Sequence, residues 1–147
     1  TKMFAIQGLR LGNGVCNSHR EKVIEYHKDT WNVNRLAQKA GATALTEKEY
    51  IEKTRNNTKK NIRDMYNLLG EIKDIKVFEP AVNFILVKLE QSLLSSGELH
   101  KRMKKHGVLI RDCSNYPGLN DKYIRLAIRD GESNREVAAI LNKCLQK

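Results

Sequence analysis

The chain has 147 residues, of which 40% are hydrophobic and 30% are charged. A chain of this length and composition can bury a real core, so a disordered tail and a fibrous repeat are both excluded. No apolar run approaches the roughly 20 residues that a membrane-spanning helix needs, and the formal net charge of +10 makes nucleic acid a partner to consider.

The first third of the chain is predicted to be mostly helical. Residues 21–28 and 35–45 favour two short helices, the second with Asn34 as its N-cap. Residues 9–16 are a candidate for an additional strand.

Three Ser/Thr-x-x-Glu patterns predict the starts of further amphipathic helices, because the hydroxyl and the carboxylate can satisfy the first backbone N–H groups reciprocally. The first helix is expected to end at Gly70 and the second at Gly107, a residue suited to the left-handed position after a helix. The third has an apolar stripe that needs a sheet to pack on. The patterns are Thr46 with Glu49, Ser95 with Glu98, and Ser133 with Glu136, and the stripe is Val137, Ile140, Leu141 and Cys144.

Four runs rich in β-branched and aromatic residues are predicted to be strands, at residues 77–78, 84–89, 108–111 and 123–128. After the helical lead, the order is strand, strand, helix, strand, strand, helix. This order predicts an α+β fold in which helices cover one face of a mixed sheet.

The positive charge is spread along predicted helices rather than gathered with aromatic residues. The two densest basic stretches, 59–63 and 101–105, contain no aromatic side chain on which a base could stack. We therefore expect solvated helix faces, and neither a nucleic acid nor a membrane as partner.

Cys16, Cys113 and Cys144 cannot all pair with one another and have no metal-binding spacing, so we expect no metal site and a reducing, cytoplasmic setting.

Several segments carry a more specific pattern. The chain opens with Thr-Lys-Met-Phe-Ala-Ile-Gln-Gly-Leu-Arg-Leu-Gly, and Trp-Asn-Val-Asn follows at 31–34. Asn-Phe-Ile-Leu-Val occupies 83–87, and Ile-Arg-Asp-Cys-Ser-Asn-Tyr-Pro-Gly-Leu at 110–119 precedes Ile-Arg-Leu-Ala-Ile-Arg at 124–129. In this order, the segments resemble the C-terminal part of the fold-type-I pyridoxal phosphate enzymes of the class I/II aminotransferase family. The similar branch includes histidinol-phosphate aminotransferase and L-threonine O-3-phosphate decarboxylase.

The resemblance implies roles for five residues. Lys2 would form the Schiff base with pyridoxal 5'-phosphate, and Arg10 would bind the cofactor phosphate. Arg125 would hold the substrate α-carboxylate and Arg111 the substrate phosphate, because a planar guanidinium can donate two hydrogen bonds to one oxyanion. Asn32 is a further candidate for substrate binding, with helix capping as its alternative role.

The positions of the two substrate arginines suggest a shared pocket. Arg111 ends one predicted strand and Arg125 lies inside the next, so neighbouring strands could aim both guanidinium groups at one ligand. Structural ion pairs with Asp112 or Asp130 are the alternative. Arg129 adds an ambiguity, because its even offset would place it on the same face as Arg125 in an unbroken strand.

In the similar enzymes the cofactor lysine lies past the middle of the polypeptide, so we expect this chain to be a C-terminal portion that is inactive alone. Residues 1–20 would be a remnant of the large cofactor-binding domain, 21–70 connecting helices, and 71–147 the small C-terminal domain. The complete protein is expected to be a homodimer that decarboxylates L-threonine O-3-phosphate, a lyase reaction of cobalamin biosynthesis. A histidinol-phosphate-type aminotransferase is the alternative, and a non-enzymatic basic binding module is the alternative of another class.

Overall fold

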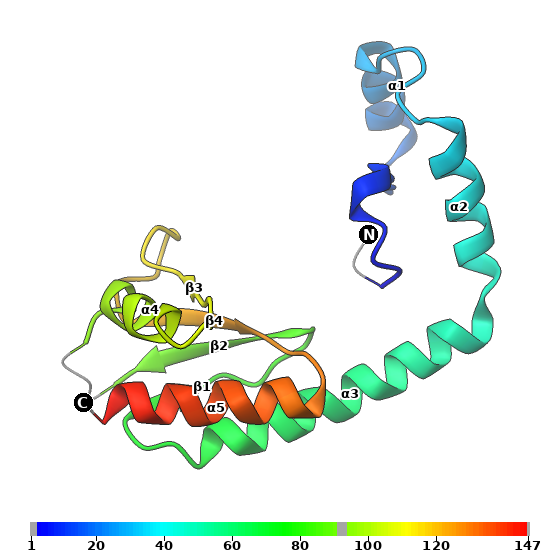
Figure 1. The fold of residues 1–147 in the computed structure, drawn as a ribbon. Helices are drawn as coiled ribbons and strands as arrows, with labels where there is room; N and C mark the ends of the chain where they lie inside the picture. Colours follow the sequence, from blue (N-terminus) through cyan, green and yellow to red (C-terminus); the bar gives the residue numbers. More distant parts are fainter. Residues whose placement is uncertain (1–2, 91–93, 147) are drawn as a thin grey trace. The chain divides into compact units, whose positions relative to one another are not determined.

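The computed structural model describes residues 3–90 and 94–146. The chain divides into two compact units, Thr1–Thr54 and Arg55–Lys147, called here the N-terminal unit and the C-terminal unit. The boundary falls within a helix, and the three-part division at residues 20 and 70 stays a prediction. The elements (Figure 1) are the 3-10 helix η1 (Gln7–Leu9), α1 (Ser18–His27), α2 (Arg35–Thr46), α3 (Lys48–Gly70), β1 (Ile75–Val77), β2 (Phe84–Leu89), α4 (Ser96–Lys104), β3 (Arg111–Asp112), β4 (Tyr123–Ala127) and α5 (Gly131–Leu145).

Asparagine side chains set the starts of the two short helices in the N-terminal unit. Asn17 Oδ1 accepts a hydrogen bond from the N–H of Arg20 at 3.0 Å. Asn34 Oδ1 accepts one from the N–H of Ala37 at 2.8 Å, so the predicted N-cap of α2 is confirmed. Asn34 Nδ2 also donates to the carbonyl of Leu9 at 3.4 Å, which ties η1 to the start of α2.

The strand expected at residues 9–16 is not formed. Beyond η1 these residues have no regular secondary structure. Leu11 instead lies against α2 at Gly41, where a Cβ atom would overlap the Leu11 side chain. A strand needs a neighbour for its backbone groups, and the described part of the N-terminal unit contains no strand. The prediction was wrong because this segment packs on a helix.

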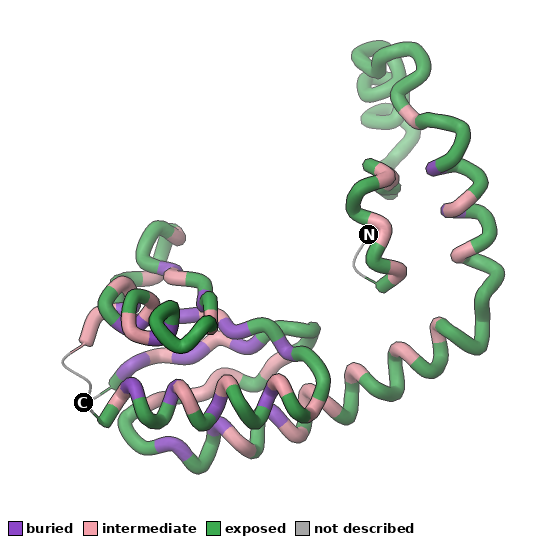
Figure 2. Tube along the Cα trace, in the orientation of Figure 1, coloured by how far each residue is buried: buried purple, intermediate pink, exposed green. Residues whose placement is uncertain are grey.

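Burial differs between the two units (Figure 2). Among the described residues of the N-terminal unit, only the small residues Ala37 and Gly41 are buried. Large apolar side chains stay in solvent, and Val15, Tyr26 and Trp31 are 95%, 86% and 95% exposed. The described part of the N-terminal unit therefore has no hydrophobic core of its own.

A four-stranded sheet in the order β1-β2-β4-β3 forms the centre of the C-terminal unit. All three neighbouring pairs of these strands are antiparallel, so the prediction of a mixed sheet was wrong. The reason is the position of β4. Helix α4 connects β2 to β3, which run in the same direction, but β4 lies between them and pairs with both. The two strands related by the helical crossover therefore never become neighbours.

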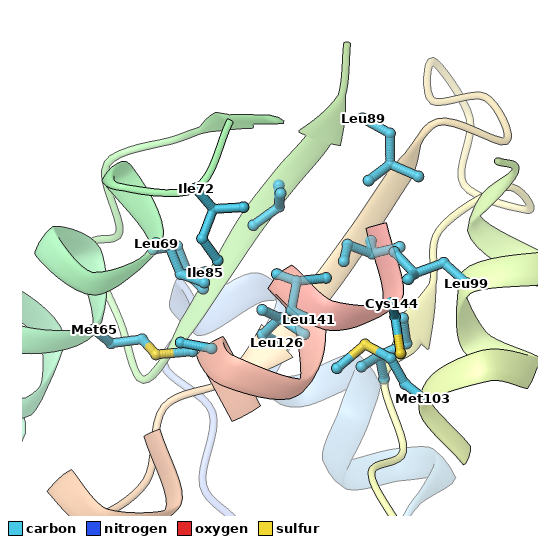
Figure 3. Packing of buried hydrophobic residues seen from close by; sticks show 14 of the residues in the cluster. Met65, Leu69, Ile72, Ile85, Leu89, Leu99, Met103, Leu126, Leu141 and Cys144 are labelled. Atoms are coloured by element: carbon cyan, nitrogen blue, oxygen red, sulfur yellow. The ribbon is translucent and has the colours of Figure 1, made fainter. Parts of the chain in front are cut away.

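One face of the sheet carries the hydrophobic core, as predicted. Met65 and Leu69 of α3, Met103 of α4 and Leu141 of α5 pack with the buried side chains of the strands (Figure 3). Buried and more exposed residues alternate along β2 and β4, as expected for a sheet covered on one side. The opposite face, called here the open face, carries Phe84, Leu86, Lys88, Arg111, Tyr123, Arg125 and Ala127.

One of the three predicted capping boxes is present. At the start of α4, the N–H of Glu98 donates to Ser95 Oγ at 3.2 Å and the N–H of Ser95 donates to Glu98 Oε2 at 2.8 Å. Thr46 belongs to the end of α2 instead, and its hydroxyl donates to a carbonyl in the last turn. Asp130, not Ser133, caps α5, because Asp130 Oδ1 accepts the N–H of Ser133 at 2.9 Å.

Candidate functional site

Arg111 and Arg125 lie directly opposite each other on the open face. They are Cα partners in the antiparallel pair of β3 and β4, and directly opposed residues of such a pair project from the same face. Arg111 is exposed and Arg125 is half-buried. The expectation that neighbouring strands carry the two arginines is confirmed.

Each of the two guanidinium groups lies over an aromatic ring. Arg125 Cζ is 4.8 Å from the centroid of the Phe84 ring, which belongs to the first residue of β2. Arg111 Cζ is 5.2 Å from the ring centroid of Tyr116, in the turn that follows β3. Arg111 Nη2 also donates to Asn115 Oδ1 at 3.1 Å. These contacts orient both cations without neutralising them.

No carboxylate pairs with either arginine within residues 3–90 and 94–146, where the ion pairs recorded involve Glu25 and Glu90. Asp112 and Asp130 accept hydrogen bonds from serine residues instead, so the alternative of structural ion pairs was wrong. Like charges placed opposite each other on two strands repel. The pair is therefore suited to binding an anion between the two side chains.

The buried thiol of Cys113 lies within the electrostatic influence of both arginines. Burial raises the pKa of Cys113, and the charges of Arg125 and Arg111 oppose that change to a smaller extent. A thiol with a raised pKa stays protonated near neutral pH, and a protonated thiol is a poor nucleophile. Cys113 is therefore a buried packing residue and not a nucleophile of this site.

Arg129 lies beyond the end of strand β4. Strand β4 ends at Ala127, and Arg129 lines a cavity of about 350 Å³ together with Val137 of α5. Its N–H donates to Asn134 Oδ1 at 2.9 Å, and its carbonyl accepts from Asn134 Nδ2 at 3.1 Å. The buried Asn134 thus fixes the chain after the strand, where Arg129 lies outside the pairing that sets Arg125 opposite Arg111. No sequence motif had identified Asn134.

Asp112 holds the end of β3 against the start of α4. Its carboxylate accepts hydrogen bonds from Ser96 Oγ at 2.7 Å and from the N–H of Ser114 at 2.9 Å. The hydrogen bond from Ser96, followed by that from Ser114, lowers the pKa of Asp112. Because Asp112 adjoins Arg111, this network holds the strand in the register that places Arg111 opposite Arg125.

We predict that Asp112→Asn lowers the free energy of unfolding at neutral pH by about 1–3 kcal/mol, because a neutral amide accepts weaker hydrogen bonds than a carboxylate. The folded-state pKa is depressed, so the stabilisation is present above the unfolded pKa of about 4 and is lost as the pH falls through the folded-state value. Urea unfolding of both proteins from about pH 7 to pH 2 measures the difference. Glu71→Gln, at an exposed position, is the control. A difference between wild type and Asp112→Asn that does not shrink at low pH would contradict this account.

The candidate cofactor residues Lys2 and Arg10 fall in the N-terminal unit, and Lys2 lies outside the described residues. The residues after Lys2 are held by Tyr50. Its hydroxyl donates to the carbonyl of Met3 at 3.1 Å, and its ring stacks on that of Phe4 with centroids 5.8 Å apart. Met3 and Phe4 are thus attached to α3.

The surroundings of Arg10 fit a phosphate group. Arg10 is exposed, has a φ of 55°, and has no ion pair with any described acid. Around Gly8 and Gly12, no heavy atom lies within 4 Å of the place where a Cβ would stand. A free guanidinium beside open backbone can bind phosphate oxygens.

Asn32 is exposed in the loop between α1 and α2. It lines a hollow of about 530 Å³ with Trp31 and Gln38. Asn32 belongs to the N-terminal unit, whereas Arg111 and Arg125 belong to the C-terminal unit. Its role in substrate binding stays a prediction.

Two other kinds of feature were sought in the part of the chain that the structure describes. No cluster of three or more His, Cys, Asp or Glu side chains there could hold a metal ion. None of the helices there combines the length and the apolar character needed to cross a membrane. Cys16, Cys113 and Cys144 are free thiols.

Comparison with known proteins identifies similar enzymes of two kinds. Histidinol-phosphate aminotransferase of Methanococcus aeolicus is 35% identical over 146 residues, which cover 97% of this chain and 38% of the relative. Threonine-phosphate decarboxylase of Salmonella typhimurium is 33% identical over 147 residues, covering 99% of this chain and 39% of the relative. The crystal structure of histidinol-phosphate aminotransferase from Clostridium acetobutylicum matches with a TM-score of 0.93 at 32% identity, covering 99% of this chain and 44% of that one.

The chain thus spans about two fifths of the length of these relatives. It corresponds to the C-terminal part of fold-type-I aminotransferase structures. Residues 1–141 match the family described as aminotransferase class I and II. The chain therefore belongs to the class I and II aminotransferase family, as its sequence motifs suggest.

Proposed function

We propose that the chain is the C-terminal portion of a pyridoxal-phosphate-dependent enzyme that decarboxylates L-threonine O-3-phosphate, a reaction of cobalamin biosynthesis. The observation that carries the proposal is the opposed pair of Arg111 and Arg125, neither of which has a carboxylate partner among the described residues. Two such guanidinium groups suit a substrate with both a carboxylate and a phosphate. The similarity to a threonine-phosphate decarboxylase supports the same reaction.

In this proposal Arg125 binds the α-carboxylate of the substrate and Arg111 binds its phosphate. Arg125 is half-buried on the inner strand β4, whereas Arg111 is exposed on the edge strand β3. A guanidinium orients an oxyanion as well as binding it, because its paired N–H groups match two oxygens. The direction in which Arg125 holds the carboxylate selects the bond at Cα that breaks. Asn32 is proposed as an additional substrate contact.

Arg10 would hold the cofactor phosphate, and the amine of Lys2 would hold the cofactor ring and return a proton to Cα after carbon dioxide leaves. When bound, pyridoxal phosphate supplies an electron sink for the pair released at Cα. A lysine amine has an ordinary pKa of about 10.4 and needs desolvation or a neighbouring cation to act at neutral pH. Arg10 is proposed to supply that cation.

The complete protein would be a homodimer with a larger upstream domain that covers the N-terminal unit. In this proposal the upstream domain would cover the exposed apolar side chains of Val15, Tyr26 and Trp31. Residues 1–20 would belong to the large domain, 21–70 would connect the domains, and 71–147 would form the small domain. The chain alone would be inactive, because the upstream domain completes the cofactor site.

A histidinol-phosphate aminotransferase is the second candidate. It is favoured by the similarity to the proteins of Methanococcus aeolicus and Clostridium acetobutylicum. Histidinol phosphate has a phosphate ester but no carboxylate, so it would engage only one of the two arginines as an anion. A carboxylate would then meet the other arginine only in the second substrate of the transfer, an oxo acid such as 2-oxoglutarate.

The experiment that separates these candidates uses the longer protein to which the chain is proposed to belong, loaded with pyridoxal phosphate. Release of carbon dioxide from L-threonine O-3-phosphate, with formation of aminopropanol phosphate, is expected. Amino transfer from histidinol phosphate to 2-oxoglutarate, without release of carbon dioxide, would overturn the decarboxylase in favour of the second candidate. Salt-sensitive retention on nucleic acid, with no reaction on either substrate, would contradict both and favour a basic binding module.

A further inference from the structure

We infer that Phe84 and Tyr116 are positioning residues that hold the guanidinium groups of Arg125 and Arg111 ready for an anionic ligand. This inference rests on the proposed function for the identity of the ligand. The orientation of the two arginines, however, follows from contacts within the chain itself.

Phe84 has a position that packing alone does not explain. It is 40% exposed although it begins an inner strand of the sheet, and the side chain of its Cα partner, Ala127, is too small to cover it. Its ring lies 4.8 Å from Arg125 Cζ. Within residues 3–90 and 94–146, the Arg125 guanidinium makes no hydrogen bond or ion pair. The ring of Phe84 is therefore the contact that determines where this guanidinium lies.

Tyr116 holds Arg111 from a turn that is itself fixed by backbone hydrogen bonds. The N–H of Tyr116 donates to the carbonyl of Cys113 at 3.0 Å, and the carbonyl of Tyr116 accepts from the N–H of Leu119 at 3.0 Å. Asn115 in the same turn accepts a hydrogen bond from Arg111 Nη2. The turn thus contacts the Arg111 guanidinium at its face and at one edge.

A neutral aromatic ring can hold a guanidinium without cancelling its charge, which a carboxylate cannot do. A carboxylate beside Arg111 or Arg125 would fix the guanidinium but would neutralise its charge and compete with the substrate for its N–H groups. A ring attracts the cation through its negative face and leaves the N–H groups at the edge of the guanidinium available. Both positive charges are thereby kept for a ligand with two anionic groups, despite their mutual repulsion.

The first measurement concerns the arginines alone. Chain 1–147 carrying 15N-labelled arginine is compared by NMR with Phe84→Leu and Tyr116→Leu, which keep an apolar side chain but remove the ring. We expect the ring-current shift and the restricted motion of the Arg125 side chain to be lost in Phe84→Leu, and those of Arg111 in Tyr116→Leu. Phe84→Tyr and Tyr116→Phe, which keep the ring, should restore them. Val82→Ala, at a neighbouring position that is 47% exposed, is the control and should leave both arginines unchanged.

The second measurement concerns binding. Titration of the same variants with inorganic phosphate should show an affinity about threefold to tenfold lower in the leucine variants, and close to the wild-type value in the ring-keeping variants and in Val82→Ala. In the complete enzyme, the KM for L-threonine O-3-phosphate should rise by a similar factor while kcat stays within about twofold. If the two rings had only a structural role, their loss would lower the free energy of unfolding without raising KM while kcat stays nearly unchanged.

The results separate the two levels of the proposal. Arginine shifts and phosphate affinities that are unchanged in both leucine variants would overturn the positioning role, even if the complete enzyme were a decarboxylase. Lost shifts and weakened phosphate binding would support it, even if the complete enzyme did not act on L-threonine O-3-phosphate. In that case the proposed function, and not the positioning role, would be wrong.

Discussion

In the proposed decarboxylase, replacing Arg125 by lysine is expected to lower kcat/KM for L-threonine O-3-phosphate by about 100-fold. Lysine keeps the positive charge but donates to the carboxylate from a single point, so one charged hydrogen bond and the fixed orientation are lost. A hydrogen bond to a charged group contributes about 1.5–3 kcal/mol, and about 1.4 kcal/mol corresponds to a factor of ten. Steady-state kinetics with wild type and variant measures the loss.

The matched control is Arg129→Lys, because Arg129 lies close in sequence but lines a cavity that does not include Arg125. It should leave kcat/KM within about twofold of the wild-type value. Equal losses from the two substitutions would mean that general positive charge, rather than the guanidinium of Arg125, is used. A loss confined to Arg129→Lys would show that the wrong arginine had been identified.

The largest expected change in stability comes from Leu141→Ala. Leu141 is fully buried where α5 packs on the sheet (Figure 3), and truncating a buried leucine removes transfer free energy and leaves a cavity. We expect the free energy of unfolding of the C-terminal unit to fall by about 2–5 kcal/mol. Urea unfolding followed by circular dichroism measures it.

Leu109→Ala is the control for that experiment, because Leu109 lies in the same unit and is 72% exposed. Its effect should stay within about 0.5 kcal/mol. A cost below about 1 kcal/mol for Leu141→Ala would indicate that α5 is not packed on the sheet as described.

The strand that carries Arg125 could be predicted because strands have a strong local pattern, whereas Arg111 was expected to end a strand at 108–111 and instead begins β3. The run at 84–89 was predicted with the bounds of β2, and Arg125 was correctly placed inside β4. The relation between strands could not be predicted in the same way. Whether β4 lies beside β3 alone or between β2 and β3 depends on contacts between distant segments. Because no local pattern shows these contacts, the sequence led to the expectation of a mixed sheet rather than an antiparallel one.

Helix starts show how two adjacent local signals compete. Asp130 and Ser133 are three residues apart and both can cap a helix, and the structure uses Asp130 with Ser133 as the donor. Thr46 satisfied the capping-box pattern, but its hydroxyl is bonded within the last turn of α2. A short pattern of hydroxyl and carboxylate does not determine which of two neighbouring helices a residue belongs to.

The aromatic partners of the arginines were missed for a related reason. Phe84 was noted only as part of a strand motif, because the contact with Arg125 depends on the register between β2 and β4. Tyr116 is close to Arg111 in sequence, and an aromatic residue in the turn after an arginine-bearing strand is a signal that could have been used. Asn134, in contrast, holds the backbone of Arg129 through a pair of hydrogen bonds that no residue spacing indicates.

The most direct test is a crystal structure of the complete protein with pyridoxal phosphate and L-threonine O-3-phosphate bound. We expect one substrate molecule to contact both guanidinium groups at hydrogen-bond distances of about 2.7–2.9 Å, with its carboxylate on Arg125 and its phosphate on Arg111. A substrate held by other residues, with both of these side chains left in solvent, would contradict the account.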